Sequence, residues 1–286
     1  KSVEFWNDMR SYNALTFSPD GLRAWQISKN RDELFEYALS SAWDVSTMNI
    51  DYTKQTVQLR RYIGELIKDM SFNNDGTKMY FAADGNEPVE STNKLIQVDL
   101  GTAYDTSTID GSSVVYLTAE HPTAPHTHVE GFCFSANGSY LYITEDGVDD
   151  IFQFTLSTPW DITTAAYTAI KTTTSNTYGL YISSDGSIMY LLQNGALKQC
   201  AMSTPYDITT LNYSSPTNTL TYRYQYSNEN ASANTWNASY LPSTYINTPE
   251  PINFVLSPDG TKFIMFGILQ NSSYYQTYNT QSITLS

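Results

Sequence analysis

The 286-residue chain contains few cysteines and few basic residues. Its two cysteines, Cys133 and Cys200, are too few for a disulfide framework, so a hydrophobic core must hold the fold together. Lys and Arg number 15 against 29 Asp and Glu, which gives a formal net charge of -14. Because a chain this acidic repels polyanions, nucleic acid and anionic membrane surfaces are disfavoured as partners.

Long apolar segments are also missing. The longest apolar run, FIMFGIL at 263–269, is much shorter than the ~20 residues of a transmembrane helix and is typical of a buried strand. We therefore expect no membrane insertion. The N-terminus has no signal-peptide pattern, which is also what removal of a leader before Lys1 would leave. No Gly-rich phosphate loop, CxxC pair or GxSxG elbow occurs.

In place of charge, the polar surface is rich in Ser, Thr, Asn, Gln and Tyr. The chain has 23 Tyr, and an aromatic content of 14% argues against disorder. Tyr gives rigid contact area and Ser and Asn give adaptable hydrogen bonds, so this composition suits an extracellular, virion or cell-surface location. A general preference of β-rich proteins for Tyr and Thr remains an open alternative.

Two short motifs recur together along the chain. An Asp-Gly or Asn-Gly pair follows five short apolar segments, and it begins at Asp20, Asp75, Asn137, Asp185 and Asp259. Trp or Tyr followed by Asp accompanies the first four pairs, at Trp43, Tyr104, Trp160 and Tyr206. Since the spacings of the two motifs drift together, one unit has been copied.

Each unit contains short strands, and no segment has sustained helical periodicity. ALTFS, DMSFN, GFCFS, GLYIS and NFVLS come before the turn, and segments such as SYLYIT and IFQFTL follow it. A less regular fourth segment comes after the Trp/Tyr-Asp motif. Four strands per repeated unit are typical of a β-propeller blade. We predict an all-β, five-bladed propeller of four-stranded antiparallel blades, closed by an N-terminal strand that completes the last blade and hides its edge.

The predicted blades form a single domain over 1–286. They cover about 14–63, 66–118, 129–173, 178–226 and 252–286, and a strand at 2–6 joins the last one. An insertion rich in Asn, Ser and Tyr runs from the fourth blade to about 249, and loops of this length are often functional. Trp43 and its equivalents are expected to pack between blades, with the following Asp and Thr holding the turn. Cys133 and Cys200 fall in strands and are predicted to be buried free thiols.

The repeats resemble those of YVTN/lactonase-like β-propellers. FSPDG at Phe17, LSPDG at Leu256, STPWDIT at Ser157 and STPYDIT at Ser203 carry the likeness, which covers nearly the whole chain. The form LSTPWDITTA is especially similar to propeller repeats of predicted phage virion and bacterial surface proteins. The resemblance implies the fold and leaves the function open, because propellers host many unrelated activities. No lactonase metal site carries over residue by residue.

One mouth of a propeller channel is built from the loops that enter the first strand of each blade. Seven residues before each Asp/Asn-Gly pair stand Asn13, Lys68, Glu130, Tyr178 and Ile252. Asp69, Glu130 and Glu250 could converge there as the carboxylates of a glycoside- or lactone-active hydrolase. The alternative that we favour is a solvated channel ringed by acidic residues that pair with Lys68.

Two segments carry residue types that bind metals. His126 and His128 would lie on one side of an extended segment beside Glu130, which suits a transition metal, with an exposed or pH-sensitive loop as the alternative. EDGVDD supplies Glu145, Asp146 and Asp149 as oxygen ligands for Ca²⁺, with a solvated turn as the alternative. Neither segment has a known ligand spacing, so we expect no cofactor.

The function that we favour is non-enzymatic: an extracellular or virion propeller that is structural or that recognises a glycan or protein receptor. Aromatic side chains stack on sugars and dock into protein grooves. The residues expected to contact the ligand on this basis are Tyr222, Tyr224, Tyr226, Trp236 and Tyr240. Asn13 and Tyr178 are expected to contact it at the channel mouth. The alternatives are the hydrolase above and a repeating subunit of a filament or capsid that contacts neighbouring subunits.

Overall fold

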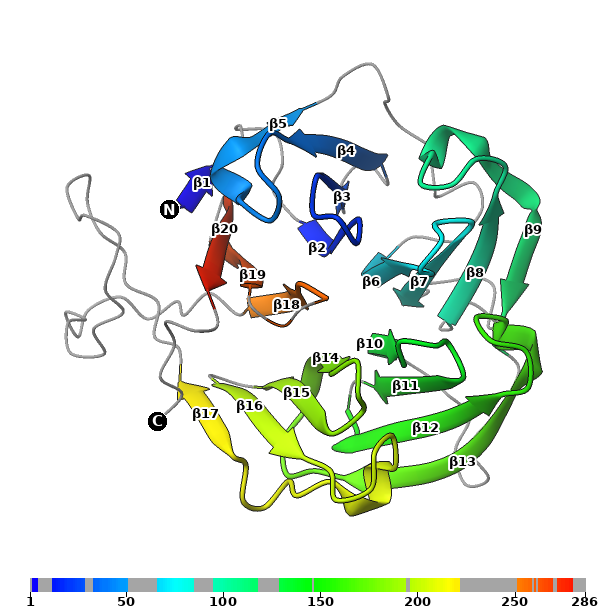
Figure 1. Ribbon diagram of the computed structural model, residues 1–286, viewed down its shortest axis with the longest axis vertical. Helices are drawn as coiled ribbons and strands as arrows, with labels where there is room; N and C mark the ends of the chain where they lie inside the picture. The colour runs from blue at the N-terminus through cyan, green and yellow to red at the C-terminus, as the bar shows by residue number, and fades with distance from the viewer. Residues whose placement is uncertain are drawn as a thin grey trace.

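The computed structural model describes residues 2–4, 12–28, 33–50, 66–84, 95–117, 129–145, 147–193, 196–221, 251–258, 260, 262–269 and 272–279. Their strands pair into four-stranded antiparallel sheets, five in all, which are arranged around a common axis (Figure 1). The predicted all-β propeller of four-stranded antiparallel blades is confirmed.

The sheets are numbered here in chain order of their innermost strands. Sheet 1 contains β2 (Tyr12–Phe17), β3 (Arg23–Ser28), β4 (Glu33–Leu39) and β5 (Met48–Ile50). Sheet 2 contains β6 (Leu66–Phe72), β7 (Lys78–Asp84), β8 (Leu95–Leu100) and β9 (Ile109–Tyr116). Sheet 3 contains β10 (Val129–Phe134), β11 (Tyr140–Glu145), β12 (Asp150–Leu156) and β13 (Ala165–Thr172). Sheet 4 contains β14 (Thr177–Ile182), β15 (Ile188–Gln193), β16 (Ala196–Ala201) and β17 (Asn218–Thr221).

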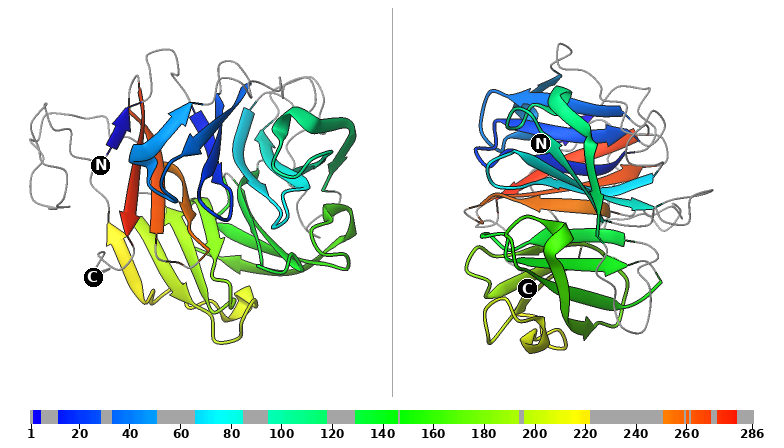
Figure 2. Two further views of the ribbon diagram at one scale, coloured as in Figure 1. Left: turned by 45° about the horizontal axis from the view of Figure 1, so that its top comes forward. Right: turned by 90° about the vertical axis from the view of Figure 1, so that its right-hand side faces the viewer.

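Sheet 5 combines the two ends of the chain. It contains β18 (Pro251–Leu256), β19 (Lys262–Leu269), β20 (Ser272–Asn279) and β1 (Ser2–Glu4). β1 and β20 are antiparallel, with Val3 opposite Tyr275, and the two strands lie side by side in Figures 1 and 2. The inner strands contact one another around the axis in the order β2, β6, β10, β14, β18 and back to β2.

The two repeated motifs fold against each other in a contact that we call the Gly–aromatic clasp. It pairs Gly21 with Trp43, Gly76 with Tyr104, Gly138 with Trp160 and Gly186 with Tyr206. The backbone N–H of each aromatic residue donates to the glycine carbonyl at 2.8–3.0 Å. A Cβ on any of these glycines would lie 2.1–2.6 Å from the nearest ring atom, so only glycine leaves room for the ring.

The clasp requires an uncommon backbone conformation of the aromatic residue. Trp43, Tyr104, Trp160 and Tyr206 have φ values of 58–64°, and they are the positive-φ residues other than glycine in the described part of the chain. This left-handed region is strained for bulky side chains. The following Asp residue stabilises it, because its Oδ1 accepts the backbone N–H of the second residue beyond, at 2.9–3.1 Å, and caps a short 3₁₀ helix.

The carbonyls of the clasp residues also join neighbouring sheets. Those of Tyr104, Trp160 and Tyr206 accept hydrogen bonds from Arg23, Tyr80 and Tyr142 of the preceding sheet, respectively, at 2.5–2.8 Å. Burial raises the pKa of Tyr80 and of Tyr142, which keeps both phenols protonated as donors. Between sheets 5 and 1, Lys262 Nζ reaches the carbonyl of Ala42, the residue before Trp43, at 2.9 Å.

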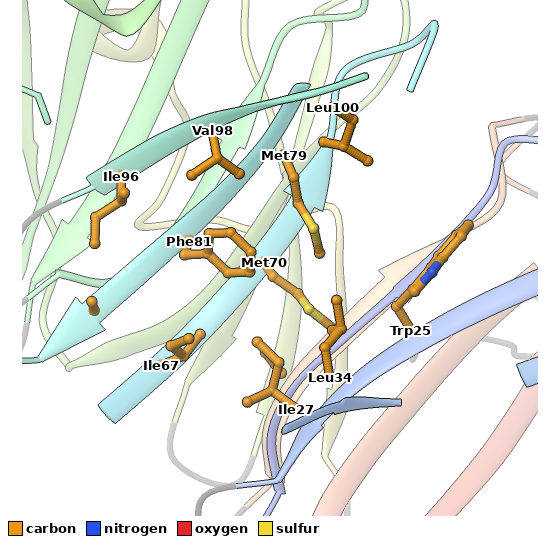
Figure 3. Close-up of a cluster of buried hydrophobic side chains, with 12 residues drawn as sticks. Trp25, Ile27, Leu34, Ile67, Met70, Met79, Phe81, Ile96, Val98 and Leu100 are labelled. Atoms are coloured by element: carbon orange, nitrogen blue, oxygen red, sulfur yellow. The ribbon is translucent and has the colours of Figure 1, made fainter. Parts of the chain in front are cut away.

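Apolar side chains fill the space between sheets. Figure 3 shows Trp25, Ile27 and Leu34 of sheet 1 facing residues of sheet 2 such as Met70 and Phe81. The predicted position of the clasp aromatics between blades is confirmed: Tyr104 stacks on Trp25, and Tyr206 stacks on Tyr140, each pair spanning two sheets.

Both cysteines are free and buried, as predicted. Burial raises the pKa of the Cys133 thiol well above its usual range and that of the Cys200 thiol to about 11. Both thiols are therefore protonated at neutral pH and serve as small apolar side chains of the core.

Two of the outer strands have irregular pairing. β9 and β13 each contain an irregularity, where the register shifts between Gln97 and Asp99 and between Gln153 and Phe154 of the partner strands. Bulges at the edge of a sheet discourage edge-to-edge association at that strand.

Replacing Gly138 with alanine tests the clasp. The new Cβ would lie 2.3 Å from the Trp160 ring at a φ of +72°, so we expect a loss of about 2–4 kcal/mol in the free energy of unfolding, measured in urea. Gly147→Ala is the matched control: its φ is +76° and nothing lies within 4 Å, so about 1 kcal/mol is expected. Equal losses in the two variants would contradict the packing role of the clasp.

Candidate binding site at the channel mouth

Each inner strand contains a β-bulge at the same position. The pairing register shifts between Tyr12 and Ala14, Ile67 and Asp69, Val129 and Gly131, Thr177 and Gly179, and Pro251 and Asn253. The extra residues are Asn13, Lys68, Glu130, Tyr178 and Ile252, which we call the bulge ring. These are the five positions that the sequence spacing places at the channel mouth. Bulges of this kind re-aim a side chain and are common beside functional sites.

The bulge ring differs in chemistry from sheet to sheet, unlike the turns. The clasp repeats Gly with Trp or Tyr in four sheets, and Asp follows each aromatic. The bulge position instead holds an amide, an ammonium, a carboxylate, a phenol and an aliphatic chain. The fold therefore does not restrict the residue at the bulge as it restricts the glycine of the clasp.

Two members of the ring form an ion pair across sheets. Lys68 Nζ lies 2.7 Å from Glu130 Oε1, and the two side chains are 26% and 13% exposed. This is the pairing that the solvated-channel alternative expects. It brings the bulges of sheets 2 and 3 together and neutralises both charges locally.

Asp69, which follows the bulge of sheet 2, points into the protein. Its Oδ1 accepts the N–H of Met70 at 2.8 Å, and its Oδ2 accepts the N–H of Phe132 in sheet 3 at 3.1 Å. The residue is 7% exposed. Both oxygens are thus used by backbone donors, and the carboxylate joins two neighbouring sheets. Glu250, the third carboxylate of the hydrolase hypothesis, lies outside the described residues.

Sheets 3 and 4 approach closely behind Glu130 and Tyr178. A Cβ on Gly131 would lie 2.8 Å from the carbonyl oxygen of Tyr178 and 3.2 Å from the Cα of Gly179. Only glycine after the bulge lets the two backbones come this near. The Tyr178 side chain is partly exposed.

A polar network beside Tyr178 has no signal in the sequence. Lys198 Nζ and Thr174 Oγ1 each lie 3.0 Å from the Tyr213 hydroxyl, which donates to Gln193. Burial opposes ionisation of this phenol, but the hydrogen bonds, first that with Lys198, outweigh it and lower the pKa of Tyr213. Because Gln193 Nε2 also donates to Thr177, the network fixes the strand that leads into the Tyr178 bulge.

The other predicted contact residues are described in part or not at all. Asn13 and Ile252 lie at the bulges of β2 and β18, where only their backbone is described. The aromatic residues of the insertion lie outside the described residues, namely Tyr222, Tyr224, Tyr226, Trp236 and Tyr240.

Only some of the predicted metal ligands lie among the described residues. His126, His128 and Asp146 lie outside the described residues. Glu145 is 4% exposed at the end of β11, and the Asp149 carbonyl accepts hydrogen bonds from the backbone N–H and the hydroxyl of Thr173. Among the described residues, no three His, Cys, Asp or Glu side chains gather as a metal-binding group. None of the helices in this part of the chain is long and apolar enough to cross a membrane.

Comparison with known proteins yields structural likeness only. No protein-family model and no curated protein matches the chain. Among solved structures, a candidate 6-phosphogluconolactonase from Bacteroides uniformis is 17% identical, with 96% of this chain and 69% of that chain covered and a TM-score of 0.47. A functionally unknown protein from Desulfotomaculum acetoxidans is 11% identical, with 95% and 69% covered and a TM-score of 0.49. Because the sequence identities and TM-scores are this low, the comparison assigns neither an activity nor a ligand to this chain.

Replacing Asp69 with asparagine separates a structural role from a catalytic one. Asparagine would place an N–H₂ group against a backbone N–H, so we expect a loss of about 1–3 kcal/mol in the free energy of unfolding, measured in urea. Asp110→Asn is the control, because Asp110 is exposed and its Oδ1 accepts hydrogen bonds from the backbone N–H and the hydroxyl of the nearby Ser112, and about 0.5 kcal/mol or less is expected. Full stability of Asp69→Asn would contradict the structural role.

Proposed function

We propose that this protein is a non-enzymatic binding module of an extracellular, virion or cell surface, which recognises a glycan or protein partner at the mouth of its channel. The observation that carries the proposal is the bulge ring: five structurally equivalent positions, each with different chemistry, at the inner strands of five sheets. Repeated architecture with variable residues at one mouth suits recognition of an irregular ligand surface.

The carboxylates favour binding over hydrolysis. A glycosidase-type mechanism needs two carboxyl groups that face a common open site. Asp69 gives both oxygens to backbone donors, and Glu130 is paired with Lys68. Both of the carboxylates of the hydrolase hypothesis that the structure describes are therefore engaged by other groups of the protein.

The amino-acid composition of the segment after β17 favours a second contact region. We propose that the aromatic residues at the end of the predicted fourth blade and in the insertion that follows it to about 249 extend the binding surface, because Tyr and Trp faces can stack on sugars or enter protein grooves. A subunit role in a virion or surface assembly would use the same surfaces for contacts between neighbouring subunits. Because the pairing of the outer strands β9 and β13 is irregular, such contacts are favoured through loops rather than through added strands.

Binding to a glycan array, followed by calorimetry on the best ligand, tests the proposed site. Tyr178→Ala is expected to weaken binding at least tenfold, roughly 1.4 kcal/mol, because a partly exposed ring at the mouth is lost. Tyr116→Ala is the matched control, since Tyr116 is 37% exposed on the outer strand β9 and should leave affinity unchanged. If Trp236→Ala abolishes binding and Tyr178→Ala does not, the site lies on the insertion and the channel mouth is wrong.

The mouth is a complete ring only if the propeller closes, and we propose closure by five blades with β1 as the outer strand of the last. The pairing of Ser2–Glu4 with β20 and the contact of β18 with β2 support this. Deleting residues 1–6 would leave the outer edge of β20 unpaired, while β19 still pairs with its inner edge. We therefore expect the melting temperature to fall by about 5 °C and association at the bared edge to increase. An unchanged melting curve and a monomeric elution profile would contradict closure by β1.

A further inference from the structure

We propose that Tyr213, Lys198 and Gln193 form a pH switch in sheet 4. When the Tyr213 hydroxyl loses its proton at alkaline pH, the Gln193 amide turns over and releases the carbonyl of Ser175. This inference goes beyond the proposed function and does not depend on it. It starts from the hydrogen-bond roles that the groups around the Tyr213 hydroxyl are able to take.

The proton of the Tyr213 hydroxyl points to Gln193. Lys198 Nζ lies 3.0 Å from the phenol oxygen and, as an ammonium, can only donate. The amide oxygen of Gln193 also lies 3.0 Å from the phenol oxygen and can only accept. Since a phenol has one proton, that proton goes to Gln193, and the hydroxyl of Thr174, at 3.0 Å, must donate. The Tyr213 oxygen thus accepts two hydrogen bonds and donates one.

The nitrogen of the Gln193 amide is held on the opposite side. Nε2 donates to the carbonyl of Ser175 at 3.0 Å and to Thr177 Oγ1 at 2.9 Å. Because a carbonyl only accepts, the Ser175 contact places the nitrogen on that side and the amide oxygen on the side of Tyr213. Thr177 stands opposite Gln193 in the pairing of β14 with β15, directly before the register shift of sheet 4. A turn of this amide therefore acts on the strand that enters the bulge.

Loss of the Tyr213 proton reverses the preference of this amide. The phenolate keeps the two hydrogen bonds that it accepts, but its oxygen and Gln193 Oε1 then face each other with no proton between them. Turning the amide over brings Nε2 to the phenolate as a donor and Oε1 to Thr177, whose hydroxyl can donate instead of accept. The Ser175 carbonyl loses the Gln193 donor and keeps the hydroxyl of Thr173 at 3.0 Å.

The surroundings of Tyr213 favour its ionisation. Burial, the largest effect, opposes it, but the hydrogen bonds, led by that from Lys198, together lower the pKa of Tyr213 below its ordinary value of 10.0. Lys198 supplies the opposite charge, since Nζ also lies 4.4 Å from the centre of the Tyr213 ring. Thr174 is exposed, so the proton can pass to hydroxide in the surrounding water while Lys198 keeps its own.

The other titratable groups packed near Tyr213 respond differently to pH. Its apolar cluster holds two thiols and three phenols, namely Cys133, Cys200, Tyr140, Tyr142 and Tyr206. Burial raises the pKa of Cys200 to about 11 and that of Tyr206 above its ordinary value, so Tyr213 loses its proton before them. The paired ends of β12 and β13, next to Thr173, carry the charged side chains of Asp149, Asp150 and Lys171. Lys171 Nζ reaches the Thr209 carbonyl at 3.5 Å.

An NMR titration of the intact protein, with isotope-labelled tyrosine and glutamine, tests the switch. The Tyr213 signal, identified by its absence in Tyr213→Phe, should titrate with a midpoint below pH 10.0. The side-chain amide signals of Gln193 and the backbone amide signal of Thr177 should shift with the same midpoint, and in Tyr213→Phe they should not. Because folding lowers this pKa, the intact protein should gain stability in urea over Tyr213→Phe as the pH rises through the midpoint.

Two lysine variants test the source of the effect. Lys198→Met keeps the length of the side chain and removes its charge and its donors, so it should move the Tyr213 midpoint to higher pH. Lys171→Met is the matched control: it removes the same charge from β13 and should leave the midpoint unchanged. Equal midpoints in the two variants would overturn the role of Lys198.

The intact protein decides the remaining outcomes even if a variant does not fold. A Tyr213 midpoint at or above the ordinary 10.0 would show that the network does not favour the phenolate, and the switch would be wrong. Ionisation of Tyr213 below that pH without a shift of the Gln193 signals would overturn the turn of the amide. Thermal melts of each variant would establish that it is folded.

Discussion

The Gly–aromatic clasp is the contact on which the rest of the structure depends. A bulky residue at positive φ is unfavourable on its own, and it persists here because three interactions compensate it. The ring covers a glycine, the aromatic N–H donates to that glycine's carbonyl, and the next residue is an aspartate that caps a 3₁₀ turn. The same strained residue turns its carbonyl towards the preceding sheet, where Arg23, Tyr80 or Tyr142 donates to it. One local device thus shapes sheets 1 to 4, and in sheets 2, 3 and 4 it also joins the sheet to the preceding one.

In sheets 1 to 4, the inner strand has the clasp turn at one end and the bulge at the other. At one end the strand runs into a turn whose sequence hardly varies, because sterics leave glycine as the only residue that fits. At the other end the bulge places an extra residue whose identity the fold does not restrict. Recognition can therefore vary at the bulge ring without disturbing the clasps, and the ion pair between Lys68 and Glu130 is one result of that freedom.

Much of the fold could be predicted from particular residues. The Asp-Gly and Asn-Gly pairs marked the hairpins, and the strand-like segments around them marked four strands per unit, because both signals are local. Counting back from those pairs also located the bulge ring, although nothing in the sequence indicated a bulge. The role of Asp69 was not predictable, because its second oxygen is bound by Phe132, a residue of another sheet. Tyr213 was missed for the same reason: its partners Lys198, Thr174 and Gln193 are brought together only by folding.

By itself, the sequence determined the repeated unit, its strands and turns, and the burial of Cys133 and Cys200, since each follows from alternation and turn chemistry within a short stretch. The tertiary structure alone decided the left-handed conformation of the clasp aromatics, which of the channel residues pair, and which carboxylate faces inward. Those outcomes depend on atoms contributed by a neighbouring sheet, and the distance between sheets is set by packing that no single segment encodes.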